Sequence, residues 1–173
     1  MRVGFLIMTV ALLSQRALAQ HETSDIRIVY NPDGKIDVRR YEIKVQILYG
    51  RKEVRGSVTM DVVTDATEIP IFLDKRLTMQ SIELIYPEQK PLKWNAETQR
   101  ANVGFITQGR EKRLRIKMKY YGKPKKSLMP PWDGGFVWSS DYKGRPWIGV
   151  AVQGEGSHLW FPSFSVIYEE PET

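Results

Sequence analysis

YEIKVQILY, residues Tyr41 to Tyr49, alternates its side chains regularly enough to decide the fold class. One side of the segment carries Tyr41, Ile43, Val45, Ile47 and Tyr49, and the other carries Glu42, Lys44 and Gln46. A period of two residues is typical of a β-strand with one buried face. A turn at residues 50–53 follows and the alternation resumes over residues 54–62, so the two segments predict a β-hairpin.

The same alternation recurs in Lys112 to Tyr121, KRLRIKMKYY, where apolar side chains alternate with cations. Shorter strands are predicted at residues 68–74, 79–86, 92–94 and 103–106, and a long Pro- and Gly-rich loop at 122–135. No segment beyond the N-terminal region keeps a helical stripe over three turns, and no internal repeat is present. The chain therefore predicts an all-β fold of antiparallel sheets, either β-sandwich-like or open and saddle-shaped.

The cations of KRLRIKMKYY, at Arg113, Arg115, Lys117 and Lys119, admit two interpretations. They could contact a polyanion, since the formal net charge of the chain is +6. Alternatively, they form the solvated face of an antiparallel strand, where lysines also discourage pairing at a sheet edge. Because basic residues are spread along the whole chain, we favour the solvated face and expect no nucleic-acid partner.

The N-terminal residues indicate export. Arg2, an apolar run from Val3 to Leu13 and the small residues around Leu18 predict a signal peptide at residues 1–19, cleaved before Gln20. The apolar run is too short for a transmembrane segment. We expect a flexible N-terminus at residues 20–37, one domain at 38–173, and a secreted or periplasmic protein. The sequence contains no Cys, so no disulfide and no thiolate ligand is available.

Motifs for catalysis are lacking in the sequence. Its two His residues, His21 and His158, cannot supply H-E-x-x-H, and no phosphate-binding glycine motif occurs. Ser157 and His158 are adjacent, and adjacent residues of an extended chain point to opposite faces, so they form a poor catalytic dyad. We therefore assign no catalytic residue and no metal site to this chain.

Six aromatic side chains within thirty residues are the remaining candidate for a binding site. They are Trp132, Phe136, Trp138, Trp147, Trp160 and Phe161. Such a cluster can form a platform for a sugar or a peptide, and it can equally form the core at a loop-rich end of a β domain. The sequence leaves both alternatives open.

GGFVWSSDYKGRPWIGVAVQGEGSHLWFPS, Gly134 to Ser163, resembles part of the N-terminal domain of the aminopeptidase N family of zinc metallopeptidases. The strand from Tyr41, the segments RGSVT and IFLD, and YYGKPK fit the same family, so the resemblance covers about residues 38–163. After Pro162 the chain departs from the family, reading SFSVIYEEPET.

The resemblance implies a saddle-shaped, non-catalytic β domain that lines the substrate cleft of a zinc aminopeptidase. Zinc, H-E-x-x-H and G-x-M-E-N belong to a separate catalytic domain, so we expect an incomplete, truncated or split product with no activity alone. In the family, a Gln or Glu nine residues before the aromatic-Pro proline binds the free α-amine of the peptide. That position is Gln153 here, and Glu155 is a weaker candidate. The alternative is a stand-alone exported module that binds glycan or peptide through the aromatic cluster.

Overall fold

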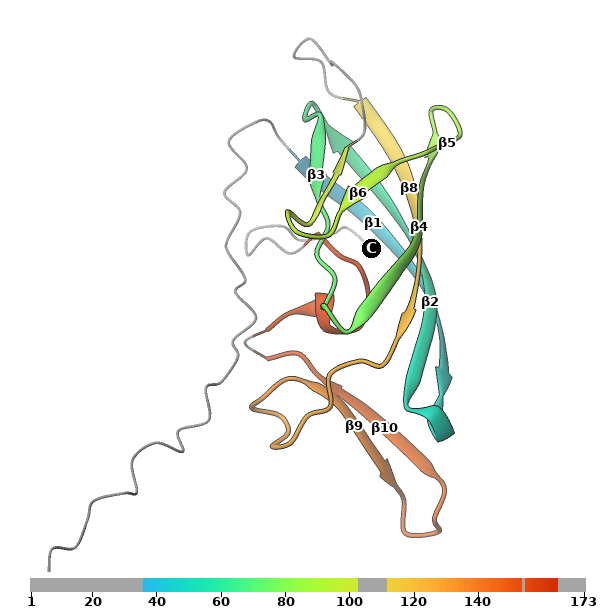
Figure 1. Cartoon of the computed structure of the whole chain (residues 1–173), viewed down its shortest axis with the longest axis vertical. Coiled ribbons are helices and arrows are strands. Elements are labelled where there is room, and N and C mark those ends of the chain that lie inside the picture. The colour runs from blue at the N-terminus through green and yellow to red at the C-terminus, as the bar shows by residue number, and fades with distance from the viewer. Residues whose placement is uncertain (1–35, 103–111, 154, 165–173) are drawn as a thin grey trace, which may run out of the picture.

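A computed structural model describes residues 36–102, 112–153 and 155–164 (Figure 1). The signal peptide expected at 1–19, the strand expected at 103–106 and the segment 165–173 lie outside the described residues. Strand β1 begins at Ile36, whose side chain is buried. This start lies two residues before residue 38, the domain boundary expected from the sequence.

The largest sheet has five antiparallel strands in the order β1-β2-β8-β4-β5. Their bounds are β1 Ile36–Leu48, β2 Glu53–Thr64, β8 Lys112–Gly122, β4 Leu77–Tyr86 and β5 Lys90–Pro91. The predicted hairpin is confirmed, since β1 pairs with β2 in a register that places Ile43 opposite Val58. The connection is a short 3-10 turn, Tyr49–Arg51, which ends at Lys52 in the left-handed conformation.

Two smaller antiparallel sheets complete the described fold. A three-stranded sheet has the order β3-β7-β6, with bounds β3 Glu68–Pro70, β7 Arg100–Asn102 and β6 Lys93–Asn95. A hairpin joins β9 Gly135–Ser140 to β10 Pro146–Ala151, and Figure 1 shows it extending from one end of the molecule. The strand predicted at 68–74 is shorter than expected, because after Pro70 only Phe72 pairs again, in an isolated bridge to Ser163.

One buried cluster joins the long sheet to the three-stranded sheet. Ile116 and Met118 of β8 lie in it together with Ile69 beside β7 and with Phe136 of β9. Gly56 of β2 is required at its position, because a Cβ there would lie 2.6 Å from the ring of the fully buried Tyr120. The side chains that alternation assigns to the inner face of β8 are therefore the ones that are buried.

The prediction of an all-β fold with antiparallel sheets is confirmed by this topology. In the part of the chain that the structure describes, no helix is long and apolar enough to cross a membrane.

Candidate functional site

The residue assigned to peptide binding lies on a tight turn that follows β10. Two backbone N–H groups, those of Glu155 and Gly156, donate to the carbonyl oxygen of Val152 at 3.2 and 2.9 Å. The turn leads into a 3-10 helix, Ser157–Leu159, whose His158 and Leu159 are buried. Gln153 is exposed on this turn. The structure thus presents the carboxamide of Gln153 to solvent from a segment that is fixed on its C-terminal side.

Glu155, the weaker candidate, points into the protein. Its carboxylate forms an ion pair with Lys125, and the two side chains are 9 % and 17 % exposed. The same Lys125 ammonium donates to the carbonyl oxygen of Asp133 at 2.7 Å. Gly134, at φ +57, leaves room for the pair, because a Cβ at this residue would lie 3.0 Å from the Glu155 carboxyl group. Glu155 therefore braces the Gln153 turn against the loop that precedes β9.

Asp133 organises that loop. The Ser127 hydroxyl donates to one of its carboxylate oxygens, and the backbone N–H of Leu128 donates to the other at 2.5 Å. These bonds, with that of Ser127 first, lower the pKa of Asp133 to about 2. Sequence reasoning missed both Lys125 and Asp133. The only sequence signal for this loop is the glycine pair Gly134 and Gly135 directly after Asp133. Both glycines adopt positive φ, which other residues rarely do.

The lowered pKa of Asp133 predicts an acid-dependent contribution to stability. A carboxyl group whose pKa is lowered by folding contributes fully to stability at pH values above its ordinary pKa, 3.8. This contribution is lost as the pH falls through the folded pKa of about 2. We expect urea unfolding to show the largest difference between wild type and Asp133→Asn above that range, and a shrinking difference on acidification. Ser127→Ala should move the loss to higher pH. Parallel profiles for wild type and Asp133→Asn would contradict this assignment.

The segment after the turn is tied to two other parts of the fold, the segment 72–74 and strand β1. The backbone N–H of Asp74 donates to the carbonyl oxygen of His158 at 3.0 Å. Ser163 exchanges two backbone hydrogen bonds with Phe72, at 2.8 and 3.0 Å. The backbone N–H of Phe164 donates to the hydroxyl of Tyr41 at 2.9 Å. These bonds hold residues 157–164 in one position on the domain.

Ser157 and His158 are not arranged as a nucleophile and its base. The hydroxyl of Ser157 hydrogen-bonds that of Ser163 at 2.8 Å. The Nδ1 atom of His158 is buried, with no hydrogen-bond partner in the described part of the chain. Burial lowers the pKa of His158, and the negative charges of Asp74 and Glu155 offset part of that shift.

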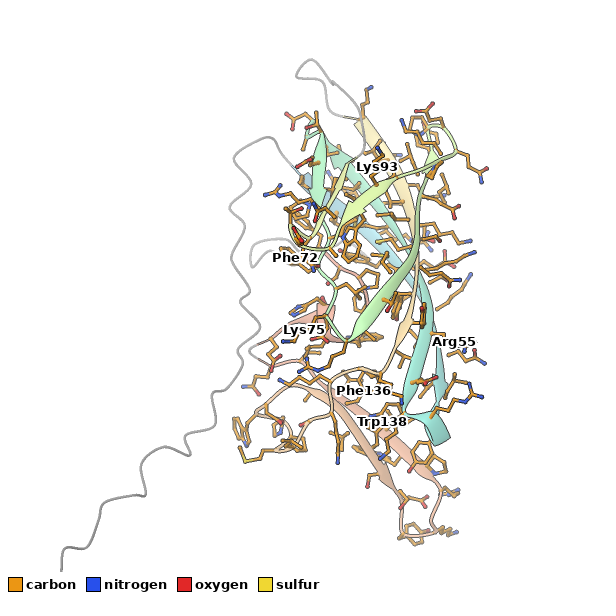
Figure 2. All side chains as sticks on the ribbon, in the orientation of Figure 1. Arg55, Phe72, Lys75, Lys93, Phe136 and Trp138 are labelled. Atoms are coloured by element: carbon orange, nitrogen blue, oxygen red, sulfur yellow. The ribbon has the colours of Figure 1, made fainter. Side chains whose placement is uncertain are left out.

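The six aromatic candidates divide between the core and the surface. Phe136 and Phe161 are buried, while Trp138 and Trp160 are half-buried and pack against the same core. Trp132 and Trp147 are 72 % and 52 % exposed. Figure 2 shows Phe136 and Trp138 near the junction between the β9–β10 hairpin and the end of the long sheet. At that junction, Tyr49 contacts Trp138 edge to face and donates its hydroxyl to Ser139.

Other exposed apolar residues near these tryptophans were not singled out from the sequence. They are Leu128 and Met129 on the loop before β9, Tyr142 on the hairpin turn, and Val150 and Val152 at the end of β10. Isolated apolar residues in loops carry no periodic signal, so the pattern of the sequence does not reveal them.

Within residues 36–102, 112–153 and 155–164, no three His, Cys, Asp or Glu side chains gather closely enough to hold a metal ion. No family model matches the sequence, and no curated protein matches it.

Proposed function

We propose that this chain is a non-catalytic β domain similar to the N-terminal domain of aminopeptidase N-like metallopeptidases. In this proposal, residues 152–163 form one wall of a peptide-binding cleft, and the exposed carboxamide oxygen of Gln153 accepts hydrogen bonds from the α-ammonium group of a peptide. The main support for this proposal is the turn after β10, where Gln153 is exposed while Glu155 is held inside by its ion pair with Lys125.

The chemistry of Gln153 suits an ammonium ligand. An amide oxygen accepts hydrogen bonds from a cation, and a neutral side chain loses less hydration on binding than a carboxylate does. A hydrogen bond to a charged group contributes about 1.5–3 kcal/mol, whereas a Kd of 1 mM requires about 4.1 kcal/mol. One wall alone therefore binds a peptide N-terminus weakly, with a Kd in the millimolar range or above.

The rest of the cleft requires a partner in this proposal. The partner is a catalytic domain encoded elsewhere, which supplies the opposite wall. The family resemblance assigns the zinc and the catalytic step to that separate domain, so the proposal places neither on this chain. It also includes a secreted or periplasmic location, which the predicted signal peptide supports.

The binding of a free amine can be tested with two short peptides. We expect trialanine at millimolar concentration to shift the side-chain amide resonance of Gln153 in nitrogen-15 spectra, whereas N-acetyl-trialanine leaves it in place. Acetylation removes the ammonium donors and keeps the rest of the peptide. Equal shifts with the two peptides, or shifts only in residues far from the turn, would rule out this role of Gln153.

Two variants sharpen this experiment. Gln153→Ala should abolish the response of the neighbouring backbone signals, because it removes the acceptor from an exposed position without disturbing the core. Gln153→Glu should strengthen binding by about threefold to tenfold, because a carboxylate pairs with the ammonium charge. An unchanged affinity in Gln153→Ala would contradict the proposal even if the peptide binds elsewhere.

A second candidate function is a stand-alone module that binds glycan or peptide. The exposure of Trp132 and Trp147 supports it, because exposed indole rings are suitable platforms for sugars. It has less support than the first, since the other four aromatic candidates pack in or against the core. A saturable change in tryptophan fluorescence with an oligosaccharide, lost in Trp147→Ala, would favour it.

A further inference from the structure

A row of cations follows the outer face of β8. Arg113, Arg115, Lys117 and Lys119 alternate with the buried residues of this strand, so all four lie on the face away from the core. Side chains two residues apart on a strand are separated by about 6.5–7 Å. The row therefore spans about 20 Å with like charges only, and its members repel one another unless an anion lies near them.

The position of β8 removes one explanation for these charges. The sequence suggested that lysines here discourage pairing at a sheet edge. The structure corrects this interpretation, because β8 is the third of five strands and pairs with β2 on one side and β4 on the other. Both of its backbone edges are already hydrogen-bonded, so its cations cannot protect an open edge.

The neighbouring strands add as many cations as carboxylates, so the surplus of positive charge is that of the row itself. The cations on β1 and β2 of this face are Arg39, Arg40, Lys44 and Arg55, and its carboxylates are Asp37, Glu42, Asp61 and Glu83. The row and its neighbours thus hold eight cations against four carboxylates, a surplus of four.

Three of the four carboxylates already pair with cations of the same face, among them Asp37, which pairs with Arg39 at 2.5 Å. Arg115 binds both carboxylate oxygens of Asp61, at 2.5 and 2.7 Å, and Lys44 binds Glu42 at 2.7 Å. The hydrogen bond from Arg115 to Asp61, and that from Lys44 to Glu42, lower the pKa values of these carboxyl groups. Lys117 and Lys119 form no ion pair with any residue that the structure describes.

The face is hollowed along its length. A central hollow is lined by Arg40, Lys44, Arg115 and Lys117, together with the hydroxyl-bearing Ser57 and Thr59. It shares Arg40, Asp61 and Arg115 with a second hollow near Arg113, and Lys44 and Ser57 with a third near Arg55 and Lys119. The three hollows thus follow one another along the face, and we call the surface that they occupy the basic strip. Figure 2 shows Arg55 on the side of the long sheet opposite Lys93.

We propose that the basic strip binds a linear sulfated polysaccharide. Regularly spaced cations along the basic strip match a flexible chain of regularly spaced anions, and Ser57 and Thr59 between them can donate hydrogen bonds to sulfate or sugar oxygens. A single row about 20 Å long suits a linear chain better than a planar lipid surface. The bases of a nucleic acid would need aromatic platforms along the row, and among the described residues only Tyr86, opposite Arg115, and Tyr121, beyond Lys119, lie beside it.

The test uses the full chain and heparin as the probe. We expect saturable binding by calorimetry at low salt, with an affinity that falls as salt rises because ion pairing releases counterions. The double variant Lys117→Gln/Lys119→Gln should bind at least tenfold more weakly and should show a smaller salt dependence. Its circular dichroism and melting temperature should match wild type, since both side chains lie outside the core.

The matched control is Lys93→Gln/Lys143→Gln, which removes the same charge from exposed lysines outside the strip. This control should change the affinity by less than threefold. An equal loss in the two double variants would overturn the proposal, because it would show attraction to net charge alone. Tighter binding to oligo-dT or to phosphatidylglycerol vesicles than to heparin at the same salt would also overturn it.

Discussion

Phe136→Ala is expected to lower the free energy of unfolding by about 3–5 kcal/mol, which is typical for removing a fully buried aromatic ring. The Phe136 side chain is 1 % exposed and stacks on Trp138 with 5.2 Å between ring centroids. Its backbone also exchanges hydrogen bonds with Lys125 and Ser127, so the residue fixes the β9–β10 hairpin to the loop before it. Urea unfolding followed by circular dichroism would measure the loss.

Trp147→Ala is the matched control for this prediction. Trp147 is an aromatic residue of the same hairpin, yet it is 52 % exposed, so its replacement should cost less than about 1 kcal/mol. Similar losses in the two variants would show that the cluster is not divided between core and surface as the structure indicates.

Glu155→Leu should lower the free energy of unfolding by about 2–4 kcal/mol. The substitution leaves the Lys125 ammonium, which is only 17 % exposed, without its carboxylate. Breaking a buried ion pair from one side costs about 3–5 kcal/mol, and the residual exposure of Lys125 reduces that value. Because the pair braces the Gln153 turn, the variant should also lose the response of Gln153 to trialanine.

Two further variants isolate the ion pair. Lys125→Met/Glu155→Leu removes both charges and should recover part of the lost stability, because no uncompensated charge remains. Glu42→Gln breaks the exposed pair with Lys44 and should leave the free energy of unfolding nearly unchanged, because water screens this pair. If the double variant were less stable than Glu155→Leu, the Lys125 ammonium would be held mainly by the Asp133 carbonyl group.

Alternation predicted the strands of the long sheet well but could not predict their order. The residues that pack inwards from β8, such as Ile116 and Met118, are those that a period of two assigns to one face. Periodicity tells which face is buried and carries no information about which strands pair. The position of β8 between β2 and β4 depends on contacts between residues far apart in the sequence, and it changed the interpretation of Lys117 and Lys119.

The candidate site was predictable in its residue types and not in its arrangement. The sequence offered Gln153 and Glu155 as neighbours with one role, and the structure exposes the first and encloses the second. What separates them is Lys125, thirty residues earlier on a loop that has no regular pattern. Trp and Phe are common both in cores and in binding sites, so only the folded structure could distinguish Phe136 from Trp147.

The strand order also constrains when the domain can become stable during synthesis. Both β2 and β4 need β8 as a neighbour, and β8 begins at Lys112, well after β4 ends at Tyr86. Until the ribosome has released β8, the edges of β2 and β4 that pair with it are bare and can pair with other chains. A pause in translation before Lys112 would therefore prolong the aggregation-prone state, whereas the same pause after Gly122 would not.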